Sequence, residues 1–155
     1  MPKFRTKRRV PHSSAEMFAL VADVQAYPKF LPLCRDLRLR ESRETPDGKQ
    51  VLVADMEVGY KAIRETFTSR VTCDPARLEI FVEYVDGPFK HLENYWRFVE
   101  TGEHSCTVEF DIAYEFRSRA LALLVGGMFD AAFRKFAEAF ETRANVVYGR
   151  AAGII

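Results

Sequence analysis

The sequence predicts an α+β domain in which a curved antiparallel sheet of six or seven strands wraps around a long C-terminal helix, with a short helical segment after the first strand. Apolar residues recur at every second position from Arg35 to Phe116, the period of strands with one buried face. They recur at helical spacing from about Arg119 to Tyr148. A chain of 155 residues has the length of one domain and can bury a sizeable core.

The N-terminal elements follow from alternation and capping. Basic and apolar side chains alternate over Lys3–Val10, which predicts the first strand. Ser13 and Glu16 form a capping-box pattern, so a short helix is expected from about residue 14 to 24. The run Tyr27–Cys34 contains two prolines, each of which removes a donor and favours extended geometry before it. We expect a compact, apolar connector there.

Turn signals divide the period-two region into five or six antiparallel strands. They lie at Pro46-Asp47-Gly48, Asp74-Pro75, Asp86-Gly87-Pro88 and Thr101-Gly102. One face of each strand is apolar and the other mostly charged, so we expect one covered face and one wet face. The covered face is predicted to carry Leu52, Ala54, Met56, Val58, Tyr60, Ile63, Phe67, Val71, Leu78, Ile80, Val82, Tyr84, Leu92, Trp96, Phe98, Val108, Phe110, Ile112, Tyr114 and Phe116.

The long amphipathic helix supplies the cover. About 28 residues at 1.5 Å each would span about 42 Å, more than a flat sheet of this size needs, so the sheet is expected to curl around it. Gly126-Gly127 interrupts the pattern at about 1 kcal/mol per glycine relative to alanine, which predicts a kink or break there. Gly149 is the predicted stop.

Composition excludes several classes of function. The formal net charge of +1 creates no global field toward nucleic acid, and we expect no DNA partner. The three cysteines and three histidines show no disulfide or metal-ligand spacing, and the histidines are expected at the surface. Motifs of acyl transfer and phosphate binding are absent from the sequence. No apolar run is long enough to span a bilayer, so we predict a soluble, cytoplasmic protein.

Two polar side chains, Glu65 and Asn94, fall on the apolar face by strand parity. Either the strand is bulged or near a rim there, or these residues form a polar handle in an apolar pocket, with Arg97 or Lys90 nearby. Such a pocket would suit a quinone, a sterol or a polyketide.

The aromatic residues of the long helix also permit two interpretations. They either fill the interior or line an aromatic tunnel. The residues concerned are Met128, Phe129, Phe133 and Phe136, facing Trp96, Phe110 and Tyr114.

Basic residues gather on the first two strands. Lys3, Arg5, Lys7 and Arg9 share one face of the first strand, while Arg38 and Arg40 share the polar face of the second. They form either a solvated edge that resists aggregation or a basic patch for anionic lipid head groups or ribosomal RNA.

Four runs of the sequence are distinctive: Tyr27-Pro28-x-Phe30-Leu31-Pro32-x-Cys34, Gly59 to Val71, Gly87-Pro88-Phe89-Lys90-His91-Leu92 through Phe98, and the ending Phe133 to Gly149. Together with the order of elements they resemble the coenzyme Q-binding protein family of the START-like superfamily, also described as polyketide cyclase/dehydrase-like or helix-grip. The resemblance covers nearly the whole chain, so residues 1–155 are expected to form a single START-like lipid-binding domain. Leu33 departs from the resemblance, because the family often has Trp there.

The resemblance implies a non-enzymatic carrier or chaperone that holds ubiquinone and supports respiratory electron transport and quinone biosynthesis. It implies ubiquinone as a bound ligand with no required cofactor, and a bacterial protein in transient contact with the inner membrane or respiratory complexes, peripheral on the inner face. One alternative is the ribosome association toxin branch of the same family, which binds the large ribosomal subunit and blocks subunit joining. A second alternative is a cyclase-like enzyme that uses the same cavity.

We hypothesise that the isoprenoid tail lies between sheet and helix, with no catalytic or metal-ligating residue. The Tyr27–Leu33 connector and the Gly87–Lys90 turn would form the mouth, and a break at Gly126-Gly127 would let the helix swing. The expected lining and mouth residues are Tyr27, Phe30, Leu31, Pro32, Glu65, Phe67, Pro88, Phe89, Lys90, Asn94, Trp96, Phe110, Tyr114, Met128, Phe129, Phe133 and Phe136.

Overall fold

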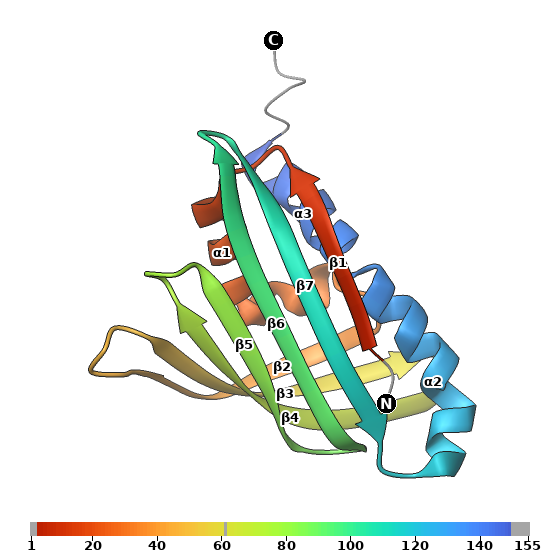
Figure 1. Cartoon of the computed structure of the whole chain (residues 1–155). Coiled ribbons are helices and arrows are strands. Elements are labelled where there is room, and N and C mark those ends of the chain that lie inside the picture. Colours follow the sequence, from red (N-terminus) through yellow and green to blue (C-terminus); the bar gives the residue numbers. More distant parts are fainter. Residues whose placement is uncertain (1–2, 61, 150–155) are drawn as a thin grey trace.

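Seven antiparallel strands form one sheet that curves around the C-terminal helices (Figure 1). The structure is a computed structural model that describes residues 3–60 and 62–149. The strand order is β1-β7-β6-β5-β4-β3-β2, so β2 to β7 form a meander and β1 adds beside β7. The strands are β1 (Lys3–Val10), β2 (Cys34–Glu44), β3 (Gln50–Tyr60), β4 (Ile63–Asp74), β5 (Glu79–Asp86), β6 (Phe89–Gly102) and β7 (Ser105–Phe116). The predicted α+β class and curved sheet are confirmed.

The curvature of the sheet creates the interior of the protein. In Figure 1, β1, β7 and β6 run at a steep angle to β2, β3 and β4, so the sheet forms a half-open shell around the helices. The predicted alternation holds along β7, where every second residue from Cys106 to Phe116 is buried. Leu78 precedes β5 with a φ of 54° instead of lying within a strand. The side chain of Tyr60 lies outside the described residues.

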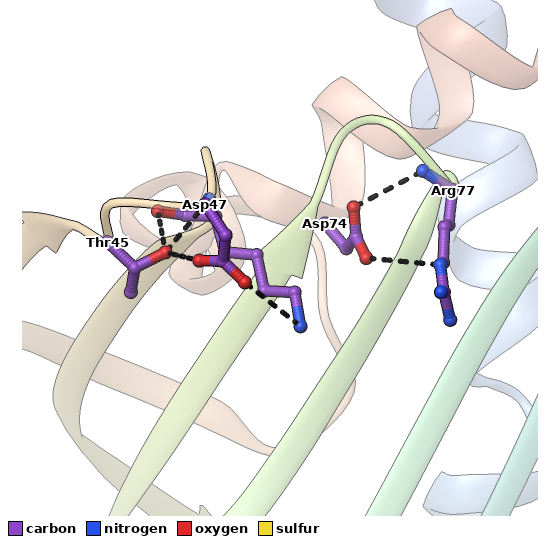
Figure 2. A network of polar contacts seen from close by, with 5 residues as sticks. Thr45, Asp47, Asp74 and Arg77 are labelled. Carbon is purple, nitrogen blue, oxygen red and sulfur yellow. Dashed lines mark hydrogen bonds and ion pairs between the residues drawn. The ribbon is translucent and has the colours of Figure 1, made fainter.

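Two of the predicted turns are held by short-range polar contacts (Figure 2). In the β2–β3 turn the Thr45 hydroxyl donates to the Asp47 carboxylate, and the Lys49 N–H donates to the Thr45 hydroxyl oxygen over 3.1 Å. The Thr45 hydroxyl holds the pKa of Asp47 below its ordinary value. In the β4–β5 turn the Arg77 N–H donates to the Asp74 carboxylate over 3.3 Å. Such side-chain contacts to nearby backbone fix where each strand reverses.

The N-terminal helix α1 (Ser14–Ala22) begins with the predicted capping box. The Ser13 hydroxyl accepts from the Glu16 N–H, and the Glu16 carboxylate accepts from the Ser13 N–H, each over 3.1 Å. The chain continues as a short 3₁₀ helix, η1 (Val24–Lys29), which includes Pro28. The chain then turns toward β2 at Leu33, whose φ is 67°.

The C-terminal region forms two helices, α2 (Arg119–Arg134) and α3 (Phe136–Tyr148), which meet at Lys135. The predicted break at Gly126-Gly127 is therefore wrong, because both glycines lie within α2. Tertiary packing places the break instead: α2 contacts β7, whereas α3 contacts α1 and β1. A single straight helix could not follow both surfaces of the curved shell. Gly149 caps α3, as predicted, with a φ of 82°.

Three polar links fasten α3 to the N-terminal elements. Arg8 pairs with Glu141 over 2.5 Å, and the Tyr148 hydroxyl donates to the Glu16 carbonyl over 3.1 Å. His12 is only 2% exposed, and its Nε2 lies 2.7 Å from Asn145 Oδ1. The prediction of a surface histidine is wrong here, because α3 packs over the end of β1, a contact that the sequence pattern does not reveal. Of the other histidines, His91 is half-buried and His104 is exposed.

Candidate functional site

An apolar cavity lies between the sheet and the C-terminal helices. Its free volume is about 70 Å³, well below the roughly 300–1,000 Å³ of clefts that hold small molecules. The sheet supplies the floor, the helices the roof, and the connector after η1 one side wall. Its lining residues are Val24, Tyr27, Leu31, Pro32, Leu33, Leu37, Ala54, Met56, Val58, Phe67, Ser69, Val71, Val82, Leu92, Asn94, Trp96, Ile112, Phe129, Ala132, Phe133, Phe136 and Phe140.

Small side chains account for the free space. Ala54 of β3 and Ser69 of β4 are directly opposite each other in the ladder, so the floor is shallow at that point. Ala132 of α2 lines the same cavity from above. Because interiors otherwise pack at crystal-like density, three small side chains among large aromatic rings leave a void.

The Asn94 side chain is satisfied within the protein. Its Nδ2 donates to the Asp111 carbonyl over 2.9 Å, and its Oδ1 accepts from Trp96 Nε1 over 2.9 Å. Asn94 is 8% exposed, and both of its polar ends are occupied. Its main effect is to fix the plane of the Trp96 ring against the cavity. Arg97 and Lys90 do not reach the interior, because they pair with acids on the outer face.

The hydroxyl of Ser69 is a polar lining group that was not predicted from the sequence. None of the side-chain hydrogen bonds found among the described residues involves the Ser69 hydroxyl, whereas the Tyr27 hydroxyl donates to the Val21 carbonyl. Burial raises the pKa of Tyr27 well above its ordinary value, so this phenol stays protonated. Strand parity places Ser69 between Phe67 and Val71 on the covered face, and this signal was available in the sequence.

The predicted site residues fall into two groups. The first group lines the cavity and comes from η1 and its connector, from β4 and β6, and from both C-terminal helices. It consists of Tyr27, Leu31, Pro32, Phe67, Asn94, Trp96, Phe129, Phe133 and Phe136. The second group, Phe30, Glu65, Pro88, Phe89, Lys90, Phe110, Tyr114 and Met128, does not line it.

The Gly87–Lys90 turn is closed, which corrects its predicted role as a mouth. Phe89 is 0% exposed and packs among other aromatic rings, with ring centroids 4.9 Å from Phe116 and 5.6 Å from Phe67. The side chain of Lys90 is exposed, and its Nζ lies 3.8 Å from Glu115 Oε2. The parity of the strand puts Phe89 inward, where it is part of the packed core.

The remaining predicted residues surround the cavity at other places. Phe110 forms a layer behind Trp96, with ring centroids 4.6 Å apart, and Tyr114 packs on Phe133 at 4.9 Å. Glu65 and Met128 line a separate void of about 10 Å³ beneath α2, beside Leu33. Phe30 faces an outer groove instead of the cavity.

The basic residues of the first two strands do not form one patch. β1 and β2 are the opposite edges of the sheet. Arg5 pairs with Asp111 over 2.9 Å, Lys7 with Glu109 over 4.0 Å, and Arg40 with Asp55 over 3.6 Å. The neighbouring carboxylates therefore offset much of this positive charge, which is what a solvated sheet edge would show.

The three cysteines of the chain are free and buried. Burial raises the pKa of Cys34 to about 12 and of Cys73 and Cys106 to about 11, so these thiols are not activated nucleophiles. Residues 3–60 and 62–149 contain no cluster of three or more His, Cys, Asp or Glu side chains that could hold a metal ion. Within the same ranges, no helix is both long and apolar enough to cross a membrane.

The curved sheet around the C-terminal helices is the START-like, helix-grip fold. A START superfamily protein from Mycobacterium smegmatis superposes with a TM-score of 0.77 at 20% identity, covering 94% of this chain and 98% of that one. Residues 10–141 match the family described as polyketide cyclase / dehydrase and lipid transport. The chain belongs to this family.

The chain is similar to two kinds of protein that differ in name. The ribosome association toxin RatA of Escherichia coli strain K12 is 36% identical over 148 residues, which is 96% of this chain and 90% of the toxin. The mitochondrial coenzyme Q-binding protein COQ10 homolog B of Xenopus laevis is 32% identical over 142 residues, which is 89% of this chain and 56% of that protein. By name, one relative associates with ribosomes and the other binds coenzyme Q.

Proposed function

We propose that this protein binds a polyprenylated quinone between the sheet and α2, and acts as a carrier or chaperone that supports respiratory electron transport and quinone biosynthesis. The observation that carries the proposal is an almost wholly apolar cavity whose lining includes the hydroxyl of Ser69. A quinone is largely hydrocarbon with a few carbonyl oxygens, so the walls match the tail and Ser69 can donate to a carbonyl. The coenzyme Q-binding relative supports this choice of ligand.

The proposal is for binding without catalysis. The lining includes no carboxylate, imidazole or thiol that could act as a general acid, base or nucleophile on a bound molecule. The cavity must widen to accept a ligand, because its present volume is small. Apolar burial contributes roughly 25 cal/mol per Å² of surface, which favours retention once a tail is inside.

Quenching of tryptophan fluorescence tests the proposal directly. Trp96 is the single tryptophan of the chain and lines the cavity, so a quinone bound there should quench its emission. We expect saturable quenching by a short-chain ubiquinone, and co-purifying quinone in organic extracts examined by mass spectrometry. A lipid-free preparation whose emission does not change on titration would overturn the proposal.

A matched pair of variants on α2 supplies the control. Ala132 lines the cavity and Ala131 is exposed on the same helix. Ala132→Leu should fill the void and weaken quinone binding at least tenfold, whereas Ala131→Leu should bind like the wild type. Equal binding by both variants would show that the quinone lies elsewhere.

A ribosome-directed role is the second candidate, because the toxin relative is 36% identical over nearly the whole chain. Sucrose-gradient profiles of ribosomes with added protein test it. Fewer joined subunits would support a toxin-like role that blocks subunit joining, and an unchanged profile would count against it.

A further inference from the structure

An outer groove of about 370 Å³ runs between η1 and α3, on the other side of the cavity wall. Pro32 lines both the groove and the cavity, and Lys135, at the junction of α2 and α3, lies on its rim. The groove residues are Lys29, Phe30, Pro32, Lys135, Glu138, Ala139, Thr142, Arg143 and Val146. Its walls therefore combine apolar side chains with three cations and one carboxylate.

Arg143 lies in the groove, and one of its donor atoms is buried. Its Nε is buried and makes no hydrogen bond with the residues that the structure describes. Its guanidinium carbon lies 5.5 Å from the centre of the Phe30 ring, a cation–π contact with a second residue of the groove. A buried donor without an acceptor costs free energy unless a bound group supplies one. The site is thus built to receive an acceptor.

The surroundings favour an anion as that acceptor. Lys29 and Lys135 are two further cations on the groove, against the single carboxylate of Glu138. An arginine fork with two flanking lysines is a common arrangement for phosphate groups.

We propose that this groove binds the phosphate of an anionic phospholipid and holds the protein on the surface of a bilayer with the cavity wall against the lipid. A lipid phosphate fits better than a free anion, because Val146 is 71% exposed beside the cations and the groove floor is apolar. The inference rests on the proposed function as a quinone carrier, because a quinone that leaves the bilayer would enter the cavity beside the groove that is docked on the membrane.

Vesicle flotation tests the docking. The full chain should float with phosphatidylcholine vesicles that contain phosphatidylglycerol and not with phosphatidylcholine alone, and added salt should release it. Arg143→Gln and Lys135→Gln should each weaken this binding about fivefold, the effect expected for one basic group near an anionic surface. The exposed Lys135 provides the test if Arg143→Gln fails to fold.

The control removes one positive charge elsewhere. Arg38→Gln alters an exposed residue of β2, outside the groove, and should bind these vesicles like the wild type. Equal losses of vesicle binding for Arg38→Gln and Lys135→Gln would overturn the proposal. It would also be overturned if the wild-type protein bound vesicles of phosphatidylcholine alone as well as those that contain phosphatidylglycerol. A competing RNA oligonucleotide that binds through Arg143 and displaces the vesicles would overturn it too.

Quinone quenching in detergent, without vesicles, separates this inference from the proposed function. Groove variants should retain quenching of Trp96, because none of the substituted residues lines the cavity. Quenching with no flotation would reject only the docking. Flotation with no quenching would reject only the quinone carrier.

Discussion

The interior of this protein has a solid end and a hollow end, although both are rich in aromatic residues. At the solid end five aromatic rings enclose Phe89, with their centroids 4.9 to 6.2 Å from the centroid of the Phe89 ring. These rings belong to Phe67, Tyr84, Tyr114, Phe116 and Phe129. At the hollow end the three small side chains Ala54, Ser69 and Ala132 leave a cavity. Aromatic content alone therefore does not mark a binding site; the small residues between the rings do.

Truncation at the solid end should have the largest effect on stability. Phe89→Ala removes a fully buried ring, so we expect the free energy of unfolding to fall by about 3–5 kcal/mol. Met56→Ala, at a half-buried residue of the hollow end, should cost clearly less because the cavity already lacks contacts there. Urea denaturation measures both, and equal losses would contradict the distinction between the two ends.

Gly87→Ala should also destabilise the solid end. The φ of Gly87 is +141°, and an added Cβ would lie 2.6 Å from the Phe67 Cβ and 2.9 Å from its Cα. The backbone conformation alone should cost about 1–3 kcal/mol in a residue other than glycine. Gly48→Ala is the control, because that glycine also has a positive φ but has no atom within 4 Å of the added Cβ. A smaller loss for Gly87→Ala than for Gly48→Ala would argue against tight packing at this turn.

Alkaline pH should destabilise the fold through the buried thiols. Burial raises the pKa of Cys73 and Cys106 from 9.0 to about 11, so each favours the folded state fully below pH 9 and loses this contribution as the pH rises toward 11. The expected loss is roughly 1 kcal/mol per thiol per pH unit within that window. Denaturation curves across this range should show a smaller pH dependence for Cys106→Ala than for the wild type. An unchanged slope would mean that other groups dominate.

The smallest effect is expected from the hydroxyl at the hollow end. Ser69→Ala should weaken quinone binding by about 0.5–1.5 kcal/mol, the usual worth of one hydrogen bond, with little change in stability. Tryptophan quenching measures the affinity. Thr68→Ala offers a comparison at the neighbouring position, where the hydroxyl donates to Asp55 over 2.5 Å and does not line the cavity. A loss of affinity confined to Thr68→Ala would remove Ser69 from the site.

The fold was predictable because its signals are periodic and local. Alternation along β7, the capping box at Ser13 and the turn residues around Asp47 each depend on a few neighbouring residues. The position of the helix break was not predictable, because the residue at the break is a lysine and not a helix-breaking glycine or proline. The break follows instead from the different surfaces that α2 and α3 cover.

The candidate site was predictable only in part. The alternation of residues along each strand identifies which side chains face inward, and it correctly places Phe67, Trp96 and Asn94 in the interior. It cannot tell a filled interior from a hollow one, since this depends on how side chains from different strands meet. Phe89 and Ser69 show the difference: both face inward, yet one fills its space and the other borders free volume.

The links of α3 to β1 and α1 imply a direction for opening. Glu141, Asn145 and Tyr148 anchor α3, whereas no side-chain hydrogen bond or ion pair in residues 3–60 and 62–149 joins α2 to a strand. α2 rests on the sheet through apolar contacts such as those of Phe129 and Phe133 and through one cation–π contact, from Arg134 to Phe4, so no hydrogen bond has to break when α2 moves. Backbone amides of α2 should therefore exchange with deuterium faster than those of α3, and a bound ligand should slow exchange mainly in α2.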